Sequence, residues 1–457
     1  MQTHFIAAQL TNPQVAETER ILRTCVHCGF CTATCPTYLL TGDELDGPRG
    51  RIYLAKDMLE KDRPADPTTV KHLDRCLTCL SCMTTCPSGV HYMHLIDHAR
   101  QHIERTYRRP LNERILRSFL AFVLPHTSRF QLALWAARAA RPLRPVLPAR
   151  MRALLDAATS TAKPASRAPL EAAGEQRASD IARSPNALRR VALLPGCVQP
   201  ALRPGINEAA VRLLNRFGVE VVVAPGTGCC GALVHHLGKQ HAAEVQAKAD
   251  IDAWMREIET KGLDAIIVTA SGCGTMLKDY GFIFRNDPEY AARAARISAL
   301  ARDVCEVVAQ LATMTPEPSV PVSGLRVAYH SACSLQHGQK LHGVAPDLLR
   351  KAGFVVLDVP EAHICCGSAG TYSMLQPEMS GQLRDRKVRN IESTRPDVIA
   401  TGNIGCLTQI SQGTGIPVVH TIELLDWAAG GPSPFATADP ASPLPSGARR
   451  AGADARS

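Results

Sequence analysis

No run of about 18 apolar residues, the minimum for a membrane-spanning helix, occurs in the sequence. This absence excludes an integral helical membrane protein. The first twenty residues, MQTHFIAAQLTNPQVAETER, lack a basic start followed by a continuous apolar stretch, so no secretory signal peptide is expected. No recognised nucleic-acid-binding motif accompanies the net charge of +9, so nucleic acid is not an expected partner.

The chain also lacks the residue patterns of a self-sufficient enzyme. No catalytic triad or flavin motif is visible, and the histidines show no metal-ligand spacing; the pair His235–His236 is predicted to lie on the surface. We therefore predict no catalytic residue. Cysteine, in contrast, is abundant, with 17 residues. Without a signal peptide, so many thiols indicate bound metal or a reducing compartment, and a cytoplasmic location is expected.

Eight of these cysteines form two copies of one motif. CVHCGFCTATCP (Cys25–Pro36) and CLTCLSCMTTCP (Cys76–Pro87) both read C-x2-C-x2-C-x3-C-P. This spacing is typical of bacterial ferredoxins, in which the fourth cysteine of each run binds the other 4Fe–4S cluster. The motif predicts two 4Fe–4S clusters, with the following ligand sets: Cys25, Cys28, Cys31 and Cys86 for one, and Cys76, Cys79, Cys82 and Cys35 for the other.

Structural zinc and disulfides are the alternatives for these eight cysteines. Zinc sites usually draw on two separated cysteine pairs rather than four cysteines within 11 residues, repeated. Disulfides are disfavoured because no export signal is recognised.

The second half of the chain contains an internal repeat with an offset of 136 residues, so that VALLPGCVQP at Val191 matches VAYHSACSLQ at Val327. Each copy alternates apolar strand-like runs with helical segments and carries a Cys-Cys-Gly motif. Such runs are typical of buried parallel strands, and α/β folds place their sites at the carboxyl ends of those strands. The GTGCCG stretch at Gly226 matches a dinucleotide fingerprint, but its glycines are missing from the second copy, which argues against cofactor binding there.

The repeated cysteines predict an additional thiol or cluster site in each copy. Gly231 and Gly367 follow the two pairs and would leave room beside them, because glycine has no Cβ atom. The alternative is that these small side chains are buried for packing, as we expect for Cys305, which fits neither pattern. The candidate residues are Cys197, Cys229, Cys230 and Cys273 in the first copy and Cys333, Cys365, Cys366 and Cys406 in the second.

A basic segment connects the two halves. It carries eight arginines and two acidic residues between Leu111 and Asp156, with helices expected over 112–124 and 127–140. The pattern fits packing helices with a solvated arginine face, or a patch that docks on an anionic membrane or an acidic partner.

The predicted fold class is an α-helical bicluster ferredoxin-like domain followed by an α/β part of two Cys-Cys-Gly domains. The boundaries are 1–110 for the ferredoxin-like domain, 111–156 for the basic helical segment, 157–190 for a linker, 191–312 and 322–429 for the two Cys-Cys-Gly domains, and 430–457 for a disordered tail.

Two ferredoxin loops followed by duplicated Cys-Cys-Gly units resemble the iron–sulfur subunits related to heterodisulfide reductase. The stretch DELDGPRGRIYLAK after the first loop more specifically resembles the glycolate oxidase (glycolate dehydrogenase) iron–sulfur subunits. The resemblance covers about residues 1 to 430. One departure concerns the wider superfamily, whose cluster-bearing members end each repeat in C-x-x-C; Met276 and Gln409 stand at the last position here.

This resemblance implies an electron carrier inside a larger oxidoreductase. A partner flavoprotein would oxidise glycolate to glyoxylate on FAD, and this chain would pass the electrons to a quinone or other acceptor. The basic segment would bring the complex to the cytoplasmic face of the inner membrane. The alternatives are the equivalent subunit of a lactate or glycerol-3-phosphate dehydrogenase, and a heterodisulfide-reductase-like thiol–disulfide enzyme.

Overall fold

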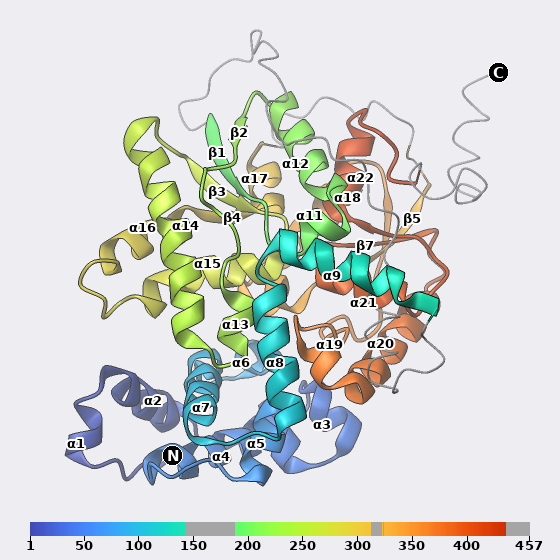
Figure 1. Cartoon of the computed structure of the whole chain (residues 1–457). Helices are drawn as coiled ribbons and strands as arrows, with labels where there is room; N and C mark the ends of the chain where they lie inside the picture. Colours follow the sequence, from blue (N-terminus) through green and yellow to red (C-terminus); the bar gives the residue numbers. More distant parts are fainter. Residues whose placement is uncertain (143–187, 312–321, 323, 436–457) are drawn as a thin grey trace, which may run out of the picture.

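The computed structural model describes residues 1–142, 188–311, 322 and 324–435. The predicted linker and tail therefore lie outside the described residues, except for 188–190 and 430–435, and so do 143–156 of the basic segment. In Figure 1 the N-terminal helices form one body below two α/β units, and α8 and α9 run along the side of the molecule that faces the viewer.

Short helices build the N-terminal part, and proline occupies the first turn of α2, α3, α4 and α5, where its missing N–H leaves no helical hydrogen bond unmade. The bounds are α1 Ala7–Leu10, α2 Pro13–Thr24, η1 Phe30–Thr32, α3 Pro36–Thr41, η2 Glu44–Asp46, α4 Pro48–Glu60, α5 Pro67–Asp74, α6 Ser81–Thr85, α7 Tyr92–Thr106, α8 Leu111–Val123 and α9 Thr127–Ala139. The last two lie within one residue of the predicted limits.

Each repeat folds around a four-stranded parallel sheet, with strand orders β2-β1-β3-β4 and β6-β5-β7-β8, so the predicted fold class is confirmed. The first unit contains β1 Arg190–Leu194, α11 Gln199–Leu202, α12 Gly205–Arg216, β2 Glu220–Val222, α13 Ala232–His236, α14 Gln240–Thr260, β3 Ala265–Val268, α15 Ser271–Ile283, α16 Ala291–Leu300, β4 Ala301–Asp303 and α17 Val304–Leu311. The second contains β5 Arg326–His330, the π-helix η5 Ser334–Gly338, α18 Val344–Lys351, β6 Val355–Leu357, α19 Tyr372–Leu375, α20 Pro377–Glu392, β7 Val398–Thr401, α21 Ile404–Ser411, β8 Val418–His420 and α22 Thr421–Ala428.

An aspartate fixes the register of the central strands in both units. The Asp264 carboxylate accepts hydrogen bonds from the backbone N–H groups of Arg189 and Arg190 at 2.7 and 2.9 Å. Asp397 accepts one from Arg326 N–H at 2.8 Å. The start of β3 or β7 is thereby tied to the start of its neighbour β1 or β5.

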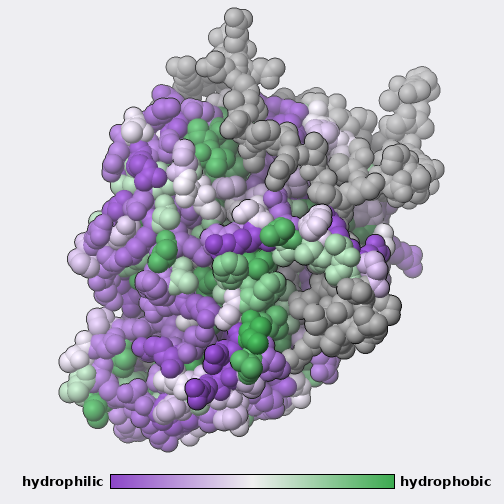
Figure 2. Space-filling model, in the orientation of Figure 1, coloured by the Kyte–Doolittle hydropathy of each residue, from purple (hydrophilic) through white to green (hydrophobic). Residues whose placement is uncertain are grey.

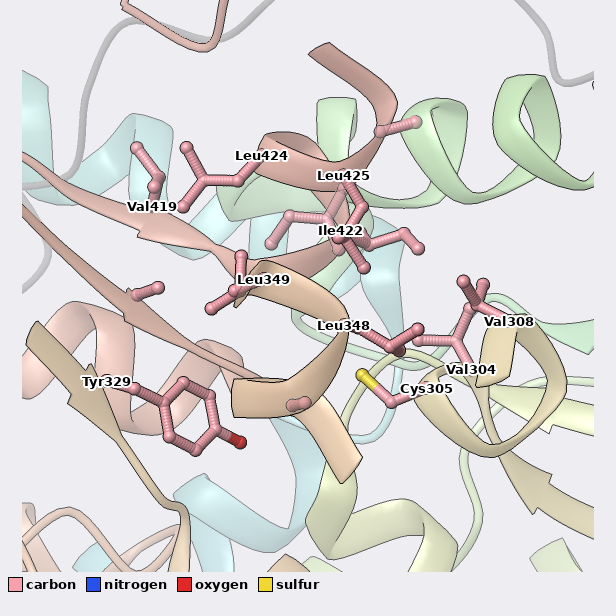
Figure 3. Packing of buried hydrophobic residues seen from close by; sticks show 14 of the residues in the cluster. Val304, Cys305, Val308, Tyr329, Leu348, Leu349, Val419, Ile422, Leu424 and Leu425 are labelled. Atoms are coloured by element: carbon pink, nitrogen blue, oxygen red, sulfur yellow. The ribbon is translucent and has the colours of Figure 1, made fainter. Parts of the chain in front are cut away.

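One continuous apolar core joins the two units. Val304 and Val308 from the end of the first unit pack with Leu348 and Ile422 from the second (Figure 3). Cys305 is 1% exposed in the same core, which confirms its predicted packing role. Because the core is shared, the two units are held in a fixed relation.

Candidate functional site

The cysteines of the first motif gather around one cavity. Cys25, Cys28 and Cys31 line it together with Cys86, the last cysteine of the second motif. Cys25 is buried, whereas Cys28 is exposed, so this cavity approaches the protein surface. The predicted first set of four thiols is therefore brought together, and its fourth member comes from the other loop.

A second cavity is lined by Cys35, Cys76, Cys79 and Cys82, the predicted second set. Cys82 also lines the first cavity, as do Pro48 and Tyr92, so the two cavities lie side by side. The exchange of the fourth cysteine interlocks the two loops, because neither motif can complete its cavity alone.

Left-handed backbone turns shape both loops in the same way. His27 and Gly29 in the first loop have φ of 57° and 86°, and the matching residues Thr78 and Leu80 in the second have φ of 52° and 63°. Such turns are uncommon outside glycine, and each pair folds the chain so that successive cysteines face one centre. The backbone N–H of Thr78 also donates to Cys76 Sγ at 3.4 Å.

The chemistry of both thiol sets fits a bound iron–sulfur group. Burial and the neighbouring thiols raise the pKa of Cys79 and Cys82 well above the usual value, and burial with Cys25 raises that of Cys31 to about 11. Closely packed thiols oppose one another's ionisation, and a cationic metal centre would remove that opposition. The residues present therefore suit the group that their spacing predicts.

Two buried arginines introduce positive charge beside the second cavity. Arg51 Nη1 lies 3.7 Å from Cys35 Sγ, and Arg100 Nη2 donates to Cys76 O at 2.6 Å. Burial alone would raise the pKa of Cys76, but Arg51 and Arg100 outweigh it and hold this pKa below its ordinary value. Cys76 is the thiol that these charges favour as a thiolate.

The DELDGPRGR stretch contains Arg51 and also the buried carboxylate that pairs with its positive charge. The carboxylate of Asp46, fully buried, accepts hydrogen bonds from His72 Nδ1 and Arg75 Nη1, both at 2.8 Å, and lies 3.6 Å from Arg51 Nη2. A Cβ atom on Gly50 would lie 2.3 Å from the Glu44 carbonyl oxygen, so only glycine fits there. Pro48 and Arg51 of this stretch line the second cavity, a role that ligand spacing alone does not reveal.

The Cys-Cys-Gly cysteines also gather, one set in each unit. In the first unit, side-chain hydrogen bonds join Cys229 to Cys197 and Cys230, and Cys230 to Cys273. In the second, Cys333 Sγ lies 3.8 Å from Cys365 Sγ, and further bonds join Cys365 to Cys366 and Cys366 to Cys406. Each candidate set is therefore one contiguous cluster of thiols.

The glycines after the cysteine pairs have a different role from the predicted one. Gly231 and Gly367 have φ of 83° and 88°. A Cβ atom would lie 2.8 Å from Ala243 O or 2.6 Å from Ser380 O, both in the following long helix. The glycines permit close approach of α14 and α20 rather than clearing space for a ligand.

The thiol set of the second unit adjoins the second cavity. Cys79 and Leu77 pack with Ile364, Cys365 and Tyr372 in one apolar cluster. Thr84 Oγ1 also lies 2.7 Å from His337 Nδ1 across the same boundary. The second cavity is thus in contact with the second Cys-Cys-Gly unit.

The surface prediction for the histidine pair is wrong for His235. Its side chain is 7% exposed and lies 3.3 Å from the Asp97 carboxylate of α7. Burial alone would lower the pKa of His235, but Asp97 raises it above the ordinary value. The residue therefore joins the first α/β unit to the ferredoxin part.

The side of α8 that is exposed to solvent is not the arginine face that packing helices were predicted to have. Arg117 is buried and donates to Asp74 at 2.7 Å. The outward face is mainly apolar, because Leu111, Ile115, Phe119 and Phe122 are 52–67% exposed. Arg114 is the exposed arginine of this helix. Leu132 and Trp135 of α9 are also exposed, and Figure 2 shows hydrophobic surface over α8 and α9. We call these six apolar residues the apolar stripe.

No helix in the part of the chain that the structure describes is long and apolar enough to cross a bilayer.

Comparison with known proteins identifies the same parts of the chain. Residues 21–90 match the 4Fe-4S dicluster domain, and 191–278 and 327–411 match the cysteine-rich domain. The glycolate oxidase iron-sulfur subunit of Escherichia coli is 45% identical over 94% of this chain and 99% of its own length. The probable glycolate oxidase iron-sulfur subunit of Bacillus subtilis is 31% identical over 90% of this chain and 94% of its own length.

Two further similarities are weaker, one because it covers half of the chain and the other because its sequence identity is low. Lactate utilization protein A of Bacillus licheniformis is 31% identical over 52% of this chain and 99% of its own length. The crystal structure of a hypothetical protein from Helicobacter pylori has a TM-score of 0.54 at 10% identity, covering 93% of this chain and 74% of that one. This last likeness concerns the fold alone.

Proposed function

Because this chain belongs to the family of glycolate oxidase iron–sulfur subunits, we propose that it receives electrons from a partner flavoprotein that oxidises glycolate to glyoxylate on FAD. The chain passes them towards a quinone or another acceptor. The observation that carries the proposal is the pair of adjoining cavities: each contains one predicted set of four cysteines whose fourth member comes from the other loop, and Cys82 lines both cavities. When bound, 4Fe–4S clusters supply one-electron redox chemistry at such sites.

The residues of this chain position and tune that chemistry. Cys25, Cys28, Cys31 and Cys86 would hold one cluster, and Cys35, Cys76, Cys79 and Cys82 the other. Cys28 is exposed, and its neighbours Val26 and Phe30 are exposed apolar side chains. Exposed apolar patches mark interaction sites, so we assign the flavoprotein contact to this surface.

Anaerobic reduction of the purified complex tests the substrate. The tagged chain is isolated from its own host with its partners bound, and glycolate, lactate or glycerol 3-phosphate is added separately. We expect glycolate to bleach the iron–sulfur absorption first. Bleaching only by another substrate would support the electron-transfer role but contradict glycolate as the substrate of the complex. No bleaching by any of them, with clusters and flavin present, would overturn the assignment to this kind of complex.

We also propose that the complex lies peripherally on the cytoplasmic face of the inner membrane, where a quinone would be available. The apolar stripe would enter the lipid headgroup region, and the exposed Arg114 and Arg129 would face anionic lipid. Arg129 lies 4.0 Å from the centre of the Phe122 ring, so charge and apolar surface are adjacent. Amphipathic helices with this distribution bind at membrane interfaces.

The double variant Phe119→Glu with Phe122→Glu tests this contact. We expect its binding to anionic phospholipid vesicles to fall roughly tenfold or more, because each change removes a large apolar side chain and adds negative charge. Vesicle flotation measures the effect. Val245→Glu, at an exposed apolar position on α14, is the matched control and should bind normally. Undiminished binding by the double variant, or none by the unmodified complex, would contradict the proposal, and release of the flavoprotein would assign the stripe to the subunit interface.

A further inference from the structure

Three buried side chains of different chain segments converge in the second Cys-Cys-Gly unit. One ring nitrogen of His330 and the sulfurs of Cys366 and Cys406 are donor atoms that all lie within 4.8 Å of one another. We propose that His330 is a metal ligand there, and that its imidazole and the two thiolates bind a metal centre of the zinc or iron class. This proposal goes beyond the electron-transfer function and does not depend on the identity of the substrate.

The three donors come from the carboxyl ends of adjacent strands. His330 is the last residue of β5, Cys366 follows β6, and Cys406 lies in α21 after β7. Since the sheet order is β6-β5-β7, the central strand carries the histidine between the two cysteines. Parallel α/β sheets place ligand sites at this edge. His330 and its two thiol partners are 5% exposed or less, so the donors meet in the protein interior.

The donor set limits the metal. Imidazole and thiolate together suit zinc and iron, whereas calcium and magnesium prefer oxygen ligands. Two thiolates on one tetrahedral ion lie about 3.8 Å apart, given bonds of about 2.3 Å. The sulfurs of Cys333 and Cys365 are 3.8 Å apart, and Cys365 is hydrogen-bonded to Cys366. These two thiols adjoin the donor group but are not among the ligand atoms that all lie within 4.8 Å of one another.

A buried lysine supplies the countercharge. Lys387 is 1% exposed, and its Nζ donates to the carbonyl oxygen of Glu361 at 2.7 Å. Its ammonium group interacts electrostatically with the thiols of Cys365, Cys366 and Cys406. A divalent ion with two thiolates is neutral, and each further thiolate ligand would add a negative charge whose burial the neighbouring cation would partly offset.

The first unit differs at both of these positions. At the repeat offset of 136 residues, Leu194 matches His330. In the long helices that follow, Ala243 and Ser380 face the equivalent glycines Gly231 and Gly367, so Lys387 has Asp250 in its place in the first unit. The buried carboxylate of Asp250 accepts a hydrogen bond from Gly228 N–H beside Cys229. The first unit therefore has neither the imidazole nor the cation, and the proposal is confined to the second unit.

Metal analysis of the full chain, purified anaerobically with its partners, tests the proposal. Two 4Fe–4S clusters account for about eight iron atoms per chain, so we expect zinc or iron beyond that number. His330→Ala should lower the affinity of this extra metal about 100-fold, so that dialysis against a chelator removes it. His342→Ala, an exposed histidine of the same unit, and Cys229→Ser, in the first unit, should both retain it.

The iron of the two ferredoxin loops serves as the internal folding control, because His330→Ala should keep about eight iron atoms while losing the extra metal. If His330→Ala does not bind these eight iron atoms, the variant His330→Cys is tested in its place. The cysteine restores a donor, so metal should be retained with a changed absorption spectrum. No metal beyond eight irons, an extra metal unaffected by His330→Ala, or one lost in Cys229→Ser would overturn the proposal. These counts do not depend on bleaching by glycolate, so the two proposals fail separately.

Discussion

Replacing Cys76 with serine is expected to remove about four iron atoms per chain and to abolish substrate-dependent turnover of the complex. Cys76 lines the second cavity and is the thiol whose ionisation Arg51 and Arg100 favour. A serine hydroxyl remains protonated at neutral pH and is a poor ligand for iron, so this site would lose its group. Iron analysis and turnover with an artificial acceptor measure the two effects.

Cys305→Ser provides the matched control for this substitution. Cys305 is buried, as Cys76 is, but it lies in the core shared by the two α/β units and lines neither cavity. The Cys305→Ser variant should keep its iron and its activity, and its free energy of unfolding should fall only slightly because a hydroxyl is placed in an apolar core. Normal turnover by Cys76→Ser with four iron atoms missing would refute the relay through the second site.

Arg51→Leu is expected to lower the midpoint reduction potential at the second site by on the order of 100 mV. The guanidinium lies close to Cys35 and interacts electrostatically with Cys76. Removing a positive charge makes the uptake of an electron less favourable. The substitution also leaves the buried Asp46 with two partners instead of three, which should lower the free energy of unfolding by about 3 kcal/mol. Potentiometric titration followed by electron paramagnetic resonance, and urea unfolding, measure these changes.

Two variants separate charge from structure at this position. Arg51→Lys keeps the charge but loses the hydrogen bonds to His72 O and Thr37 Oγ1, so its potential should stay close to that of the natural protein while its stability falls. Arg49→Leu removes a neighbouring arginine whose side chain is 39% exposed and pairs with Glu44 rather than with Asp46, so it should change neither quantity at the second site strongly. An unchanged potential in Arg51→Leu would exclude the electrostatic role.

Motif spacing predicted the parts of the site that are local in sequence. The C-x2-C-x2-C-x3-C-P pattern constrains residues a few positions apart, and the exchange of Cys35 and Cys86 follows from the same pattern. The repeat predicted both parallel sheets, because runs such as AIIV at Ala265 are apolar at every position, as strands covered on both faces must be.

Charges and histidines that act across long separations were not predicted. Arg51 pairs with Asp46 and lies against Cys35, and a single sequence gives no sign that a charged residue is buried. The period of α8 shows that the helix has two faces but not which one is outside; that choice is made by Asp74, which binds Arg117 from 43 positions earlier. His330 lies far in sequence from Cys366 and Cys406, and only the sheet order brings the three together.

The exchange of the fourth cysteines also constrains how the protein is made. A ribosome that has synthesised the first motif through Pro36 has produced four thiols but no complete cavity, because Cys86 has not yet been added. The second cavity needs Cys35 as well as the residues up to Cys82. Cluster insertion into either loop must therefore wait until about the first 85 residues have emerged. Until then the nascent thiols are exposed to oxidation and to competing metals. The interlocked arrangement thus makes maturation a late and nearly simultaneous event for both clusters.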